Sequence, residues 1–182
     1  MREVARKSLK NFALVSAVVF AAAALTFAQP RTPREPELPV GCEILQAPAG
    51  NTVAFKVYAS GVQVYEWNGA AWGFVGPIAT LYANPGLNGK VGTHYGGPTW
   101  KSNSGSIVTG KNPVRCTPDP ESIPWLLLEA NESDDSGIFA GVTYLQRVNT
   151  VGGNAPDEPG TLAGEQAFVP YTTVYIFYRS TY

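Results

Sequence analysis

The stretch Phe168-Val-Pro-Tyr-Thr-Thr-Val-Tyr-Ile-Phe-Tyr178 decides the fold. It is dominated by β-branched and aromatic residues, which favour extended backbone. Side chains alternate between the two faces of a strand, so Tyr171 and Tyr175 share one face while Ile176 and Tyr178 share the other. Because both faces are largely apolar, the stretch predicts a strand that is covered on both sides.

Further runs of the same kind recur along the chain before this stretch. They lie at 52–59, 62–67, 72–75, 78–83, 91–100, 106–109, 125–129 and 138–148. Gly, Pro, Asn and Ser separate them, and Ser60-Gly61 predicts a hairpin turn between the first two runs. Beyond residue 41 no window of about 12 residues shows helical periodicity free of Gly or Pro. The pattern predicts an all-β fold, an antiparallel β-sandwich or squat barrel of about eight or nine strands.

The N-terminus has the three-part layout of a signal peptide. Four basic residues precede an almost wholly apolar run at 12–27, and small residues stand at Thr26 and Ala28. We predict a signal peptide over 1–28, a Pro-rich tether over 29–40 and a single β domain over 41–182. The alternative is an uncleaved anchor, but the apolar run is shorter than the roughly 20 residues that cross a bilayer. The predicted location is secreted, periplasmic or extracellular.

Composition excludes several classes of partner. The 182 residues include 13 basic and 14 acidic ones, and loss of residues 1–28 leaves a net charge of −4. Such a chain has no basic surface for nucleic acid, and no segment after the leader is apolar enough to span a membrane. No cofactor motif is present, and a single histidine excludes any metal site that needs two. Acidic residues at 129–135 suit calcium, but they match no EF-hand and read more simply as a solvated turn, so we predict no metal.

The two cysteines are expected to pair. Outside the cytosol thiols usually form disulfides, and Cys42 with Cys116 is the only pairing available. The alternative is a reactive thiol, but nothing in the surrounding sequence would lower its pKa.

Two segments contain the candidate site residues. His94, the only histidine, lies between Tyr95 and Trp100 and is the weak candidate for a catalytic acid or base. Arg147 and Asn149, just before a double glycine, are candidates for binding a carboxylate or a sugar hydroxyl, together with Trp100 and Tyr95. Each also has a structural explanation, as a packed ring or as a group bonded to loop carbonyls.

Several blocks of sequence resemble a known family. They are Gly-Thr-His-Tyr-Gly-Gly-Pro-Thr-Trp at 92–100, Pro-Trp-Leu-Leu-Leu at 124–128, Gln-Arg-Val-Asn-Thr-Val-Gly-Gly at 146–153 and Tyr-Ile-Phe-Tyr at 175–178. In this order they are similar to the secreted family catalogued as domain of unknown function 3455. The resemblance runs from about Gly41 to Tyr178. It implies an exported single domain, and the family has no established activity to carry over.

The chain departs from the family at two places. The resemblance implies one cysteine after the Gln-Ile-Tyr-like strand and another after the Gly-Gly-x-Ala-Pro loop. Here these places hold Trp67 and the stretch 157–164, so a disulfide between them is absent and Cys42–Cys116 is a candidate replacement.

Three hypotheses for function follow. We favour a non-catalytic envelope or extracellular module that binds a glycan or a small ligand, because the chain has many aromatic residues and no assembled catalytic set. The second is a hydrolase- or lyase-type enzyme that uses His94 with Arg147 and a carboxylate. The third is a self-associating structural protein of the envelope.

Overall fold

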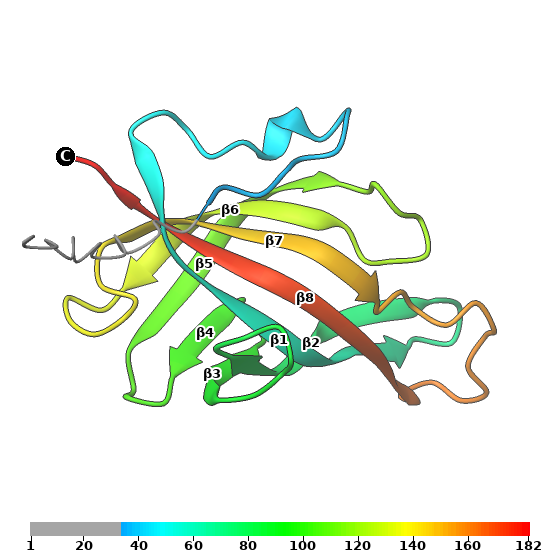
Figure 1. Ribbon diagram of the computed structural model, residues 1–182. Coiled ribbons are helices and arrows are strands. Elements are labelled where there is room, and N and C mark those ends of the chain that lie inside the picture. Colours follow the sequence, from blue (N-terminus) through cyan, green and yellow to red (C-terminus); the bar gives the residue numbers. More distant parts are fainter. Residues whose placement is uncertain (1–33) are drawn as a thin grey trace, which may run out of the picture. The chain divides into compact units, whose positions relative to one another are not determined.

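Eight antiparallel strands form one closed barrel in residues 34–182, the part of the chain that this computed structural model describes. The strands are β1 (Asn51–Trp67), β2 (Trp72–Tyr82), β3 (Lys90–Tyr95), β4 (Thr99–Ser102), β5 (Ile107–Cys116), β6 (Trp125–Ser133), β7 (Val142–Gly152) and β8 (Gln166–Ser180). Each strand pairs with its neighbours in sequence, and β8 pairs with β1 to close the sheet (Figure 1). The predicted all-β class is confirmed, and of the two predicted architectures the squat barrel is the one found.

Helix is limited to one 3₁₀ turn, η1 (Glu43–Leu45), within the described residues. No helix there is long and apolar enough to cross a membrane. The predicted signal peptide at 1–28 and residues 29–33 of the predicted tether lie outside the described residues.

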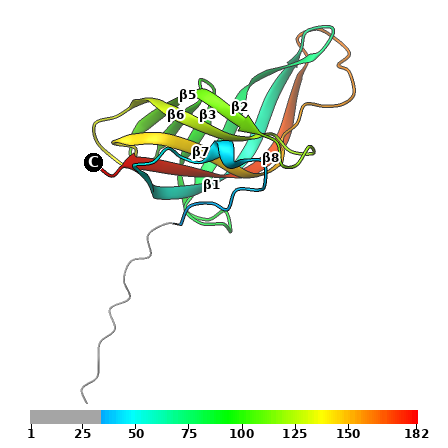
Figure 2. The ribbon, with the colours of Figure 1, turned by 90° about the horizontal axis from the view of Figure 1, so that it is seen from above.

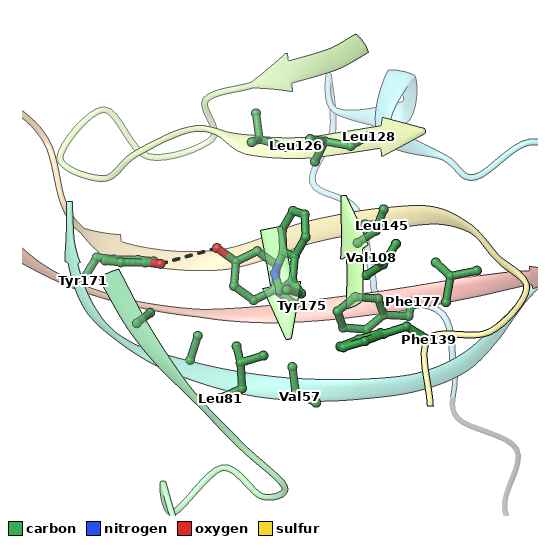
Figure 3. Close-up of a cluster of buried hydrophobic side chains, with 14 of the residues drawn as sticks. Val57, Leu81, Val108, Leu126, Leu128, Phe139, Leu145, Tyr171, Tyr175 and Phe177 are labelled. Carbon is green, nitrogen blue, oxygen red and sulfur yellow. Dashed lines mark hydrogen bonds between the residues drawn. The ribbon is translucent and has the colours of Figure 1, made fainter. Parts of the chain in front are cut away.

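The strand β8 is covered on both faces from Thr173 to Tyr178, as its sequence predicts, whereas Phe168 near its start is 55% exposed. Tyr171, Tyr175 and Phe177 point into the barrel and belong to the buried cluster that fills it (Figure 3). Ile176 and Tyr178 point outward and belong to a second buried cluster. A single strand therefore connects two cores, which explains why it contains so few polar residues.

The second cluster forms where the N-terminal segment lies against the outside of the barrel. Leu45 of η1 packs there, and η1, the short blue coil in Figure 2, contacts β5 and β6. The amide of Gln146 on β7 donates to the carbonyl of Leu45 and accepts a 2.7 Å hydrogen bond from the hydroxyl of Tyr178. These buried polar groups satisfy one another, so the segment is attached by specific bonds as well as by apolar contact.

The predicted disulfide is confirmed. Cys42 precedes η1 and is bonded to Cys116 at the end of β5, with their Cα atoms 5.5 Å apart. The bond ties the N-terminal segment to the barrel wall beside the second cluster, which includes Cys42 itself and is packed against Cys116.

One predicted turn and one predicted strand differ from the structure. Ser60 and Gly61 form no hairpin, because β1 continues through them and both residues pair with β2 and with β8. Conversely, the run 91–100 is two strands, β3 and β4, which Gly96, Gly97 and Pro98 connect. In a barrel a glycine within a strand marks a close approach of backbones as often as a turn.

Gly61 is required by such a close approach. A Cβ atom at this position would overlap the carbonyl oxygen of Ile78 and lie 2.5 Å from the Cα of Ala79. Both obstacles are backbone atoms of the paired strand, so they cannot move without disturbing the ladder.

Replacing Gly61 with alanine is therefore expected to lower the free energy of unfolding by about 2–3 kcal/mol, in the range seen for overpacked sites. Gly73→Ala is the matched control, because a Cβ there would meet only one atom, at an ordinary 3.6 Å. Urea unfolding of both variants measures the difference. Equal stability of the two variants would contradict this explanation of Gly61.

Candidate ligand-binding cavity

The interior of the barrel is packed at one end and open toward the other. At the packed end Phe139 and Phe177 lie with ring centroids 5.0 Å apart, and Phe55 stacks on Phe177 at 4.7 Å. Toward the other end lies a cavity of about 530 Å³ to which all eight strands contribute residues. Eight-stranded barrels are just wide enough to be filled by side chains or to hold one small ligand.

A local difference in pairing accompanies the opening of the cavity. β2 pairs with β3 only from Ile78 onward, so residues 72–77 pair with β1 alone. Phe74, Gly76 and Pro77 from this part of β2, together with the turn at Gly96–Pro98, line the cavity. The proline fits here because one edge of the strand carries no ladder.

Three aromatic rings form one wall of the cavity. His94 on β3 pairs in register with Trp100 on β4, and their rings stack with centroids 4.3 Å apart and planes 12° from parallel. The ring of Tyr175 on β8 meets both edge-on, at 5.0 Å from His94 and 5.2 Å from Trp100. All three residues line the cavity, which gives it a rigid aromatic surface.

His94 is held as a neutral imidazole. Its Nδ1 lies 2.8 Å from the carbonyl oxygen of Thr99, and because a carbonyl can only accept, Nδ1 carries the proton. Burial lowers the pKa of His94 from 6.5 to about 3; the Thr99 hydrogen bond opposes this shift and the charge of Arg147 adds to it. A base this weak is a poor proton carrier at neutral pH.

Arg147 places a positive charge in the cavity wall. It lies on β7, in register with Leu126 on β6 and Tyr175 on β8, and is only 9% exposed. Its Nε and Nη2 donate hydrogen bonds of 3.1 and 2.8 Å to the carbonyl of Pro124. The hydroxyl of Tyr175 also interacts with it, and among residues 34–182 no carboxylate is hydrogen-bonded to it, so only neutral groups meet the guanidinium there.

Two buried donors without an acceptor belong to residues that line the same cavity. They are Nε2 of Gln63 on β1 and Nε1 of Trp100, and both side chains are 1% exposed. Most buried polar atoms in folded proteins have a hydrogen-bond partner, so two orphan donors in one cavity require an explanation.

The structure brings together three of the five residues predicted for the site. His94, Trp100 and Arg147 line one cavity, although they come from three different strands. Tyr95 at the end of β3 does not line it and is 39% exposed. Asn149 is exposed on the outside and has a φ of 52°, where the pairing of β7 with β8 shifts register. Asparagine tolerates this left-handed conformation, so its role is to form a bulge.

Sequence reasoning missed Gln63 and Tyr175 as cavity residues. Gln63 has a detectable signal, since it is a polar residue on the apolar face of β1 that also carries Val57 and Ala59. Tyr175 has none, because its sequence context is the same as that of neighbouring core aromatics. Lys111 and Arg115 also line the cavity, because β5 continues to Cys116, well beyond the predicted run 106–109.

Residues 48–179 match a family model described as a protein of unknown function, DUF3455. The chain belongs to the DUF3455 family. No curated protein and no solved structure matches it. Two of the sequence blocks that carry the resemblance now have physical explanations. In this DUF3455 protein the block at 94–100 contributes His94 and Trp100 to the aromatic wall, and its turn at Gly96–Pro98 also lines the cavity. The block at 146–149 contributes the hydrogen bond of Gln146 to Leu45, the charge of Arg147 in the cavity and the bulge at Asn149.

The DUF3455 resemblance implies a pair of cysteines at two places, and here the side chain of Trp67 packs against Gly160 instead. A Cβ at Gly160 would lie 2.5 Å from Cγ of Trp67, so the indole lies directly on the glycine backbone. Trp67 also meets the ring of Trp72 edge-on at 5.5 Å, and Nε1 of Trp72 donates to the carbonyl of Glu158. The end of β1 and the loop before β8 are thus in contact without a covalent bond.

Proposed function

We propose that this protein is an exported binding module that takes a small, mainly apolar ligand into the barrel cavity. The observation that carries the proposal is the cavity of about 530 Å³, within the range of roughly 300–1,000 Å³ typical of small-molecule sites. Its lining joins aromatic and aliphatic side chains with a few polar groups, as such sites do. The disulfide and the predicted leader support action outside the cytosol.

The composition of the lining favours an apolar ligand over a glycan. Most of the lining is apolar or aromatic, including Ile123, Leu126 and Leu128. These side chains offer no hydrogen bonds to sugar hydroxyls, so only the few polar groups of the lining could bind them. A glycan buried here would leave most of its hydroxyls without partners, which costs free energy.

The lining also weakens the enzyme hypothesis. That hypothesis needs a carboxylate beside His94 and Arg147, and no Asp or Glu lines this cavity. Because His94 is neutral and its pKa is lowered, the cavity is better suited to holding a molecule than to transferring protons.

A neutral fluorescent probe, N-phenyl-1-naphthylamine, tests the proposal. We expect its emission to rise on binding to the wild-type protein, because the cavity excludes water. Leu126→Trp puts a larger side chain into the cavity and is expected to weaken binding about tenfold or more. Leu162→Trp adds the same ring at a site that is 74% exposed and outside the cavity, so it should leave the affinity unchanged.

The result that overturns the proposal is equally direct. If the probe does not bind the wild-type protein, or if Leu126→Trp and Leu162→Trp bind it equally well, the cavity is not a binding site. Circular dichroism of each variant confirms that the barrel is folded before the affinities are compared.

A further inference from the structure

The charged groups around the cavity are all of one sign. Lys111, Arg115 and Arg147 line it, and no Asp or Glu does. In the chain as a whole acidic residues outnumber basic ones, 14 to 13. The positive cavity therefore does not reflect the composition of the chain.

Of the three cations, Arg147 is the one that is buried. A charge buried without a charged partner is costly, and proteins usually pair such a group with an opposite charge. The guanidinium donates from Nε and Nη2 to the carbonyl of Pro124 and interacts with the hydroxyl of Tyr175, so within residues 34–182 none of its hydrogen-bond partners carries a negative charge. Pro124 occupies the side-on fork of Nε and Nη2, which leaves the end-on edge of Nη1 and Nη2 to match the two oxygens of a carboxylate.

The orphan donors on the same cavity lead to the same ligand chemistry. Nε2 of Gln63 and Nε1 of Trp100 can donate and cannot accept, and neither has a partner. Because both atoms are inaccessible to solvent, a ligand acceptor reaches them only when their side chains turn toward the cavity. His94 differs from these donors, because its Nε2 has a lone pair.

We propose that the ligand is an organic acid with an apolar body, and that Arg147 holds its carboxylate inside the barrel. This inference rests on the proposed function and specifies its ligand class. The aromatic wall of His94, Trp100 and Tyr175 packs against the body of the ligand. Lys111 and Arg115, which line the cavity and are exposed, attract the anion toward Arg147.

A matched pair of ligands tests the charge directly. 2-Naphthoic acid and 2-naphthamide have nearly the same shape, but only the acid is an anion at pH 7. By calorimetric titration we expect the wild-type protein to bind the acid at least about tenfold more tightly than the amide, as a charged hydrogen bond of about 1.5–3 kcal/mol implies.

Substitution at Arg147 assigns the preference to one residue. We expect Arg147→Gln to reduce the affinity for the acid to that for the amide, while the affinity for the amide changes little. Arg147→Lys keeps the charge without the fork and should keep a weaker preference for the acid. Arg179→Gln is the matched control, because Arg179 also donates to a main-chain carbonyl but does not line the cavity. It should keep the full preference.

The outcomes separate this inference from the proposed function. If the wild-type protein binds the amide as tightly as the acid, or if Arg147→Gln keeps the preference, the inference is wrong. If N-phenyl-1-naphthylamine binds but neither 2-naphthoic acid nor 2-naphthamide does, the proposed ligand class is wrong and the cavity is still a binding site. If none of the three compounds binds, both proposals fail. Should Arg147→Gln not fold, the acid-to-amide ratios of the wild-type protein and of Arg147→Lys still decide the question.

Discussion

Reduction of the Cys42–Cys116 disulfide is expected to lower the free energy of unfolding by about 4 kcal/mol. The bond closes a loop between residues 74 positions apart, and in the chain-entropy model a loop of this length restricts the unfolded chain by about that amount. The loop contains β1 to β4 and most of β5, so its loss releases more than half of the barrel strands from constraint in the unfolded chain.

Urea unfolding with and without dithiothreitol measures this effect. The control is the Cys42→Ala, Cys116→Ala double variant, whose stability should be the same in both conditions. A loss below about 1 kcal/mol on reduction of the wild-type protein would mean that the second cluster holds the N-terminal segment without help from the covalent bond.

Acidification is expected to destabilise the barrel through His94. The folded-state pKa is lowered to about 3 while the unfolded value is 6.5, so between these values the unfolded chain binds more protons. Stability is therefore fully present above pH 6.5 and is lost as the pH falls toward 3. The slope that one such group contributes is about 1.4 kcal/mol per pH unit.

Comparison with His94→Gln isolates this contribution from that of the carboxylates. Between pH 6 and pH 4 the wild-type protein should lose about 3 kcal/mol more than the variant, whereas above pH 7 the difference between them should be constant. Urea midpoints at four pH values give both slopes. Parallel curves over the whole range would show that the imidazole is not held neutral by burial.

The two-sided pattern of the final strand made the fold class predictable. Apolar residues occur on both faces of the stretch Phe168–Tyr178, and the two faces contribute to separate buried clusters. The length of β1 was not predictable in the same way, because Gly61 satisfies the rule for a turn and the rule for a close backbone approach equally well. Only the paired strand, where Ala79 lies opposite Gly61, decides between them.

The site was predictable residue by residue but not as a cavity. Arg147 is predicted because it lies at a strand end just before a double glycine, and Trp100 because it lies close to the only histidine; both line the cavity. Asn149, two positions from Arg147, was chosen for the same reason, but a bulge turns it to the outside. The cavity exists because eight strands close into a barrel and because the ring of Phe139 fills only one end of its interior. No local pattern encodes such a closure, since it joins residues from the whole chain.

The ladder between β1 and β8 restricts the order in which this chain can fold. It pairs residues from Asn51 to Glu66 with residues from Gln166 to Ser180, the first and last strands of the barrel. Until β8 has left the ribosome, β1 exposes an unpaired edge and its inward apolar residues, a state that is prone to aggregation. Long-range pairing of this kind is also slow. The export that we propose suits a chain that must be complete before it can close, because such a chain could cross a membrane unfolded and form the Cys42–Cys116 bond afterwards.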